Sequence, residues 1–146
     1  SAFINDQVAP ILPTDLTRYR AAVHIVPAEF QHATAMLRTK YDELFGPMLV
    51  GRAFTDEEMK HAKAVVQSPD ELFFSYGTNN DYHGLPDTRV TIPLPDQAGY
   101  GAVLAITYYV IGRLQAANPP YFAQNIERYC QTASEIFGKP ISPIVE

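Results

Sequence analysis

The sequence predicts a mainly α, single-domain bundle of about five helices, with one long loop or small hairpin and extended, proline-containing arms at both ends. Proline and glycine divide the chain into segments whose apolar residues recur at helical spacing. Of the 146 residues, 47% are apolar, which is enough for one core. The single cysteine provides no disulfide framework. We therefore expect one domain over residues 1–146, with arms at 1–13 and 139–146.

The first two predicted helices are separated by a proline. The first spans residues 14–25, with Thr14 as its cap. Its apolar positions are Leu16, Tyr19, Val23 and Val26. Because Pro27 pushes the residue before it out of the helical region, a second helix is expected over residues 27–45. Gly46 ends it.

The third predicted helix spans residues 55–67 and has the best local signature in the chain. Thr55 and Glu58 have the spacing of a capping box, in which each side chain satisfies a backbone amide of the first turn. Phe54, before the cap, can contact Met59 as a hydrophobic staple. These residues predict where the helix begins.

The stretch between residues 68 and 97 has no clear helical pattern. Residues 71–76 fit either a helix or a short strand, and both stay open. Residues 90–94 alternate as a strand does, but Pro93 restricts such a strand to a sheet edge. At most, a small hairpin is expected here.

Two further helices are predicted over residues 98–117 and 119–137, the second ending at Gly138. The first is apolar on every side, so it must be enclosed by its own bundle or by a neighbouring molecule. The predicted core consists of Leu16, Val23, Phe30, Leu37, Leu44, Met59, Val66, Val103, Ile106, Val110, Phe122, Ile126 and Tyr129.

Two Glu-x-x-His patterns are candidate metal ligands, because di-metal bundles use this spacing to place both ligands on one helical face. They consist of Glu29 with His32 and Glu58 with His61. Both occur in the first turns of consecutive helices, which lie at opposite ends if the helices pack antiparallel. We therefore expect no metal and no other cofactor.

The polar loop 77–97 is the candidate catalytic segment, because long loops in compact domains are often functional. Its candidate residues are Asp81, His83, Asp87 and Arg89. Either aspartate could orient His83 as a general base. Asn, Asp and Gly also favour tight turns, and no recognised nucleophile accompanies them. Cys130 lies on an apolar helix side and is expected to be a buried, inert thiol.

The net charge of −5 argues against nucleic-acid binding through overall charge and leaves only a local basic patch. Its candidate phosphate contacts are Arg18, Arg20, Arg38, Lys40 and Arg52. The most apolar stretch, 98–111, is shorter than the roughly 20 residues of a membrane span. No signal peptide is visible, so the expected location is the cytoplasm or an assembled particle.

The leading functional hypothesis is a structural, self-assembling subunit of the coat, capsid or filament type, forming homo-oligomers. Apolar arms and an all-round apolar helix provide more apolar surface than one core needs. The arm residues are Val8, Ile11, Leu12, Ile141, Ile144 and Val145. One alternative is a small enzyme or ligand-binding domain with its site in the loop 77–97. Another is a cytosolic inhibitor or chaperone-like protein that binds a partner.

Overall fold

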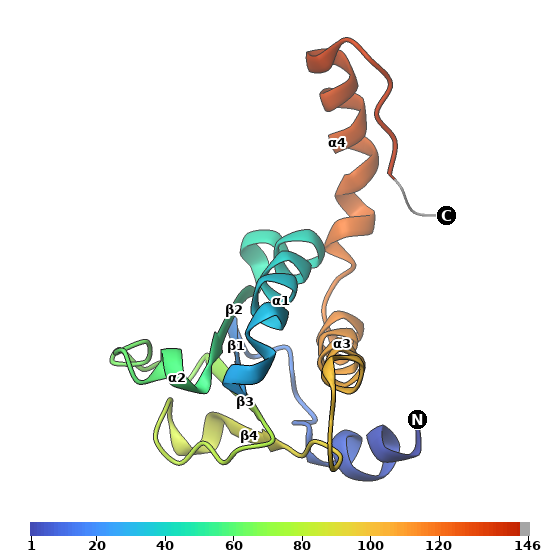
Figure 1. Cartoon of the computed structure of the whole chain (residues 1–146). Helices are drawn as coiled ribbons and strands as arrows, with labels where there is room; N and C mark the ends of the chain where they lie inside the picture. The colour runs from blue at the N-terminus through green and yellow to red at the C-terminus, as the bar shows by residue number, and fades with distance from the viewer. Residues whose placement is uncertain (144–146) are drawn as a thin grey trace.

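The chain forms an α/β domain around a four-stranded parallel sheet, as a computed structural model describing residues 1–143 shows (Figure 1). The strands are β1 (Ala21–Val26), β2 (Val50–Thr55), β3 (Glu71–Tyr76) and β4 (Arg89–Ile92), in the order β2-β1-β3-β4. The helices are α1 (Gln31–Leu44), α2 (Asp56–Met59), α3 (Tyr100–Ala117) and α4 (Tyr121–Phe137). The predicted mainly α bundle is therefore wrong, whereas the hypothesis of a self-assembling subunit stays a prediction.

The predicted helix at residues 14–25 is wrong because its second half is the central strand β1. This strand pairs in parallel with β2 on one side and β3 on the other. Its residues 22–26 are all buried. A strand covered on both faces is continuously apolar rather than alternating, so spacing alone does not distinguish it from a helix.

The remaining predicted elements had mixed outcomes. The helices expected at 27–45, 98–117 and 119–137 are confirmed as α1, α3 and α4, apart from a few terminal residues. The helix expected at 55–67 stops after the single turn of α2, although the capping box at its start is confirmed. Residues 71–76 form strand β3. The possible hairpin strand is the edge strand β4, which runs parallel to β3.

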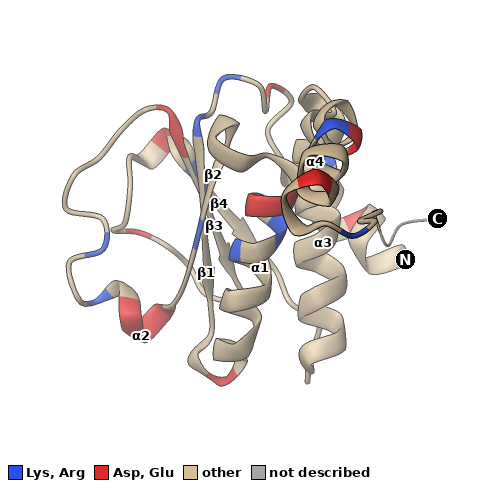
Figure 2. Ribbon diagram, turned by 90° about the horizontal axis from the view of Figure 1, so that it is seen from above, with Lys and Arg blue, Asp and Glu red and all other residues tan. Residues whose placement is uncertain are grey.

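The two faces of the sheet have different covers, which Figure 2 shows with the sheet nearly edge-on. Helices α1 and α3 cover one face, where Leu37 and Ile106 share a core cluster with Phe74. On the other face Val23 and Phe73 pack with Met59 of α2. This asymmetry follows from the strand order. The chain moves from β1 to β2 toward one edge of the sheet, and from β2 to β3 and from β3 to β4 toward the other edge. Because crossovers between parallel strands are right-handed, connections that run in opposite directions cover opposite faces.

A buried polar chain crosses the helix-covered face. The imidazole of His24 in β1 lies between two phenols, with Nδ1 2.8 Å from the Tyr76 hydroxyl and Nε2 2.6 Å from the Tyr41 hydroxyl. All three side chains are almost fully buried. Gly51 of β2 makes room for Tyr41, since a Cβ atom there would lie 2.0 Å from the Tyr41 ring.

The N-terminal arm is not extended, and its apolar residues pack on their own chain. Residues Ile4–Val8 and Ala9–Ile11 form helical turns. Val8 is fully buried and Leu12 nearly so, both in the main core cluster, whereas Ile11 is exposed. At the other end, the backbone amide of Ile141 donates to Ser134 Oγ at 2.8 Å. Ile144 and Val145 lie outside the described residues.

Helix α4 rises away from the sheet and its covering helices (Figure 1). The prediction that Tyr129 belongs to the core is wrong, because 66% of this α4 residue is exposed. Val66 was also misplaced, since it lies in the loop after α2 and is 86% exposed. Leu44, Phe122 and Ile126 are half-buried, and the other eight predicted core residues are buried. No helix within residues 1–143 has the length and apolar character needed to cross a bilayer.

Candidate functional site

A cavity of about 590 Å³ opens at the carboxyl ends of the strands. It is bordered by the segment after β1, the segment after β3, and the end of β4 with the loop that leads to α3. Its lining residues are Glu29, Phe30, Gly77, Asn79, Thr91, Ile92, Pro93, Leu94, Pro95, Gln97 and Ala98. Parallel sheets bind ligands at this edge, at the point where neighbouring strands send their connections in opposite directions. Here that point lies between β1 and β3.

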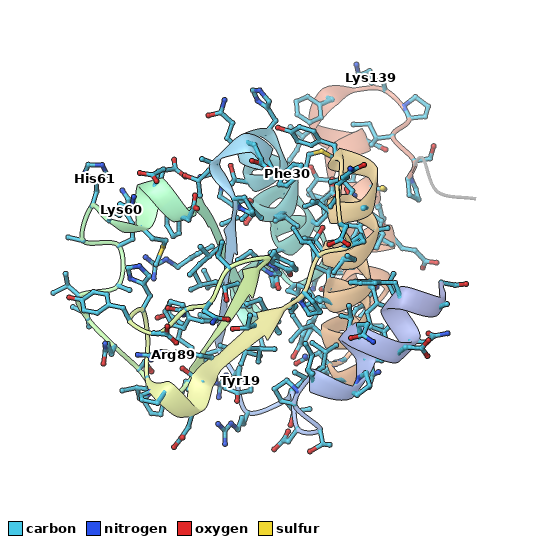
Figure 3. The ribbon with its side chains drawn as sticks, turned by 60° about the horizontal axis from the view of Figure 1, so that its bottom comes forward. Tyr19, Phe30, Lys60, His61, Arg89 and Lys139 are labelled. Carbon is cyan, nitrogen blue, oxygen red and sulfur yellow. The ribbon has the colours of Figure 1, made fainter. Side chains whose placement is uncertain are left out.

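Contacts between distant segments hold the rim of the cavity in place. The Tyr100 hydroxyl at the start of α3 donates to the Glu29 carbonyl at 2.8 Å, and its ring meets Phe30 edge-on. Figure 3 shows Phe30 where α1 and α3 come together. Gly77 has φ +73° and donates its amide to the Ile92 carbonyl at 2.8 Å. A side chain at Gly77 would be strained and would press on Leu94.

The chemistry of the lining favours binding of a small polar molecule. Asn79, Thr91 and Gln97 offer amide and hydroxyl groups, while Phe30 and Leu94 offer apolar surface. Glu29 is the only titratable side chain in the lining, and neither Lys nor Arg is present there. A single carboxylate has no second group with which to share proton transfer. The lining therefore provides recognition groups rather than an acid–base pair.

The predicted catalytic loop is held together by Arg89. Its guanidinium donates five hydrogen bonds, all to backbone carbonyls of Asp81, Tyr82, His83 and Gly84. Asn80 adds a second internal anchor, accepting from the His83 amide and donating to the His83 carbonyl. Figure 3 shows Arg89 beside this loop. Arg89 thus orders the loop through its own donors.

The other three candidates of that loop are not brought together. Asp81 and Asp87 are exposed, and neither carboxylate forms a hydrogen bond with His83 among the described residues. Partial burial lowers the pKa of His83, and the nearby positive charge of Arg89 lowers it further. None of the four lines the cavity, although Asn79, in the same loop, does.

The metal candidates are far apart in space. Figure 3 shows His61 at the outer edge of the loop layer, away from Phe30 at the start of α1. The Glu58 carboxylate accepts from the Thr55 amide at 2.8 Å as part of the capping box. Within residues 1–143, no three His, Cys, Asp or Glu side chains gather as metal ligands would. Glu29, in contrast, lines the cavity, and His32 lies one helical turn further along the chain.

Three of the five candidate phosphate contacts have other partners. Arg52 pairs with Glu71 at 2.8 Å and also donates to the Lys63 carbonyl. Lys40 pairs with Glu43, and the Arg18 guanidinium lies over the Tyr19 ring. Arg20 and Arg38 are exposed. Figure 2 shows basic and acidic residues interspersed, with an acidic group on α2.

Cys130 is buried in α4, as expected for an inert thiol. Sequence reasoning missed Asn79, Thr91 and Gln97 as site residues. A polar residue just after a strand would have been a signal only once the parallel sheet was known.

Comparison with models of known protein families finds no match to this chain, and searches of curated proteins and of solved structures find no significant match either.

Proposed function

We propose that this domain binds a small polar molecule at the carboxyl edge of its sheet. The observation that carries the proposal is the position of the cavity, which lies at the edge where the connections of β1 and β3 diverge. Its volume of about 590 Å³ falls within the range of known small-molecule sites. Part of the wall comes from the loop 77–97, the segment in which the ligand-binding hypothesis places the site.

The ligand we propose carries hydroxyl or amine groups and no negative charge. The turn Ala28–Phe30 before α1 and the first turn of α3 contribute partial positive charge at this edge, which by itself favours an anion. Glu29 adds a full negative charge, and the lining contains no cationic side chain that would hold a phosphate or carboxylate. Hydroxyl and amine groups match the amide, hydroxyl and carboxylate groups present.

A thermal-shift screen tests this proposal with two sets of small molecules. One set contains polyols, sugars and amines, and the other contains carboxylates and phosphates. We expect stabilisation by members of the first set. Thr91→Arg, which places a long cation in the cavity, should abolish it, whereas Thr14→Arg, at an exposed threonine outside the lining, should not.

Glu29→Gln separates the two kinds of ligand. It should weaken amines and leave uncharged polyols nearly unaffected, because only amines gain from the carboxylate charge. Tight binding of phosphates by the wild type would contradict the proposed ligand class, and stabilisation that survives Thr91→Arg would contradict the proposed site.

A further inference from the structure

Helix α4 has a groove beside its first half and exposed apolar side chains at its end. Its apolar residues are spaced alternately by four and three positions at Phe122, Ile126, Tyr129, Ala133 and Ile136, which is the pattern of a helix that packs against another helix. The first half of this stripe lies against the body of the protein. The second half extends beyond it (Figure 1).

We call the hollow beside the first half the α4 groove. It has a volume of about 700 Å³ and lies between α4 and the end of α1 with the turn Gly46–Met48. Its apolar wall includes Leu44, Phe45, Met48, Phe122, Ile126 and Tyr129. Among residues 1–143, no side chain fills the apolar space between them.

The second half of α4 exposes large apolar side chains of the kind that an apolar groove binds. Ile136 is 72% exposed and Phe137 64% exposed, at the end of the helix. Ten residues separate Ile136 from Ile126, so at 1.5 Å per residue they lie about 15 Å apart along the axis. Within one chain, therefore, the end of α4 cannot enter the groove beside its beginning.

We infer that two copies of this chain associate through antiparallel α4 helices, each inserting Ile136 and Phe137 into the α4 groove of the other. Two-fold symmetry requires one surface to carry both complementary parts, as α4 does. Charge agrees with this arrangement. Asp42 lines the groove and joins no ion pair within residues 1–143, and Lys139 follows the helix end that would arrive there.

The exposed area supports a second copy as the occupant. A large aromatic or aliphatic side chain offers about 150–250 Å², so Tyr129, Ile136 and Phe137 together expose roughly 400 Å² per copy. Two copies, with the other residues of both groove walls, approach the roughly 1,200–2,000 Å² that a stable interface buries. The polar side of α4, together with Lys139, carries two acidic and two basic residues, so it has no net positive charge to attract an anionic membrane.

Sedimentation velocity over a range of concentrations tests the association. The wild type should form a dimer, and the double variant Ile136→Glu with Phe137→Ser should be monomeric. Both residues are exposed, so the circular dichroism spectrum should not change. The matched control replaces Val65 by Glu and Val66 by Ser, which are exposed apolar residues in the loop after α2. This control should remain dimeric.

Disulfide trapping tests the antiparallel pairing in a Cys130→Ser background. Met48→Cys with Ile136→Cys should give covalent dimers under oxidation, and neither single substitution should. Dimers from Ile136→Cys alone would indicate parallel helices and overturn the arrangement. A wild type that is monomeric at every concentration, or that binds phosphatidylserine vesicles through Ile136 and Phe137 instead, would overturn the inference.

Discussion

The imidazole of His24 and the hydroxyl of Tyr76 lie 2.8 Å apart on neighbouring strands, in the interior of the helix-covered face. A neutral imidazole has one donor and one acceptor nitrogen, so one of its two tyrosine partners accepts a hydrogen bond and the other donates one. Burial lowers the pKa of His24 to about 3 and raises the pKa of Tyr41 and Tyr76 well above their usual value. All three groups are therefore neutral in the folded protein near neutral pH.

The protein should lose stability as the pH falls below about 6.5, the ordinary pKa of His24. Between that pH and about 3, the unfolded chain binds a proton that the folded chain excludes, so acid favours unfolding. At about 1.4 kcal/mol per pH unit, the loss between pH 6.5 and pH 5 is about 2 kcal/mol. Urea unfolding across this range measures it.

His24→Gln is the control for that prediction, because glutamine forms hydrogen bonds but does not titrate. The variant should show a smaller fall in unfolding free energy over the same pH range, even if it is less stable at neutral pH. Equal slopes for the wild type and the variant would mean that His24 is not the group responsible.

Gly51→Ala should destabilise the protein by about 2 kcal/mol or more, because the new methyl group would overlap the Tyr41 ring and displace its hydroxyl from His24. Gly112→Ala is the matched control. That glycine lies within α3 and has open space around it, so alanine should be neutral or stabilise by up to about 1 kcal/mol. Chemical denaturation compares the two, and similar effects would contradict the packing described around Gly51.

Arg89→Lys should loosen the loop over residues 81–84. Lysine keeps the positive charge but lacks the planar fork that donates to four carbonyls. We expect faster cleavage by chymotrypsin after the exposed Tyr82 and a stability loss of about 2 kcal/mol. A cleavage rate equal to that of the wild type would show that these hydrogen bonds do not order the loop.

The helices were more predictable than the sheet for a physical reason. α1, α3 and α4 have helical spacing and clear terminal signals, such as Gly138 with φ +63° after α4. β1 is buried on both faces and β2 contains Gly51 and Arg52, so neither alternates. A helix was therefore predicted over residues 14–25, because a short apolar run fits either structure.

The site was predictable only in part. The loop 77–97, which the sequence suggested as a functional segment, contributes Asn79, Thr91 and Gln97 to the lining of the cavity. Residue type alone did not identify the lining of the cavity within this loop. Arg89 donates to backbone carbonyls, and neither aspartate forms a hydrogen bond with His83 among the described residues. Glu29 was a candidate only as a metal ligand paired with His32. Its place in the cavity, after the end of β1, depends on a parallel sheet that composition and spacing did not reveal.

Amide chemical-shift mapping by NMR identifies the residues that a ligand contacts, so it tests whether ligands bind at the carboxyl edge of the sheet. A polyol or amine found by the thermal-shift screen is titrated into isotope-labelled protein. We expect the shifts to concentrate on residues 28–30, 77–79 and 91–98, which border the cavity. Shifts concentrated instead along the α4 groove, or around Tyr82 and His83, would contradict it.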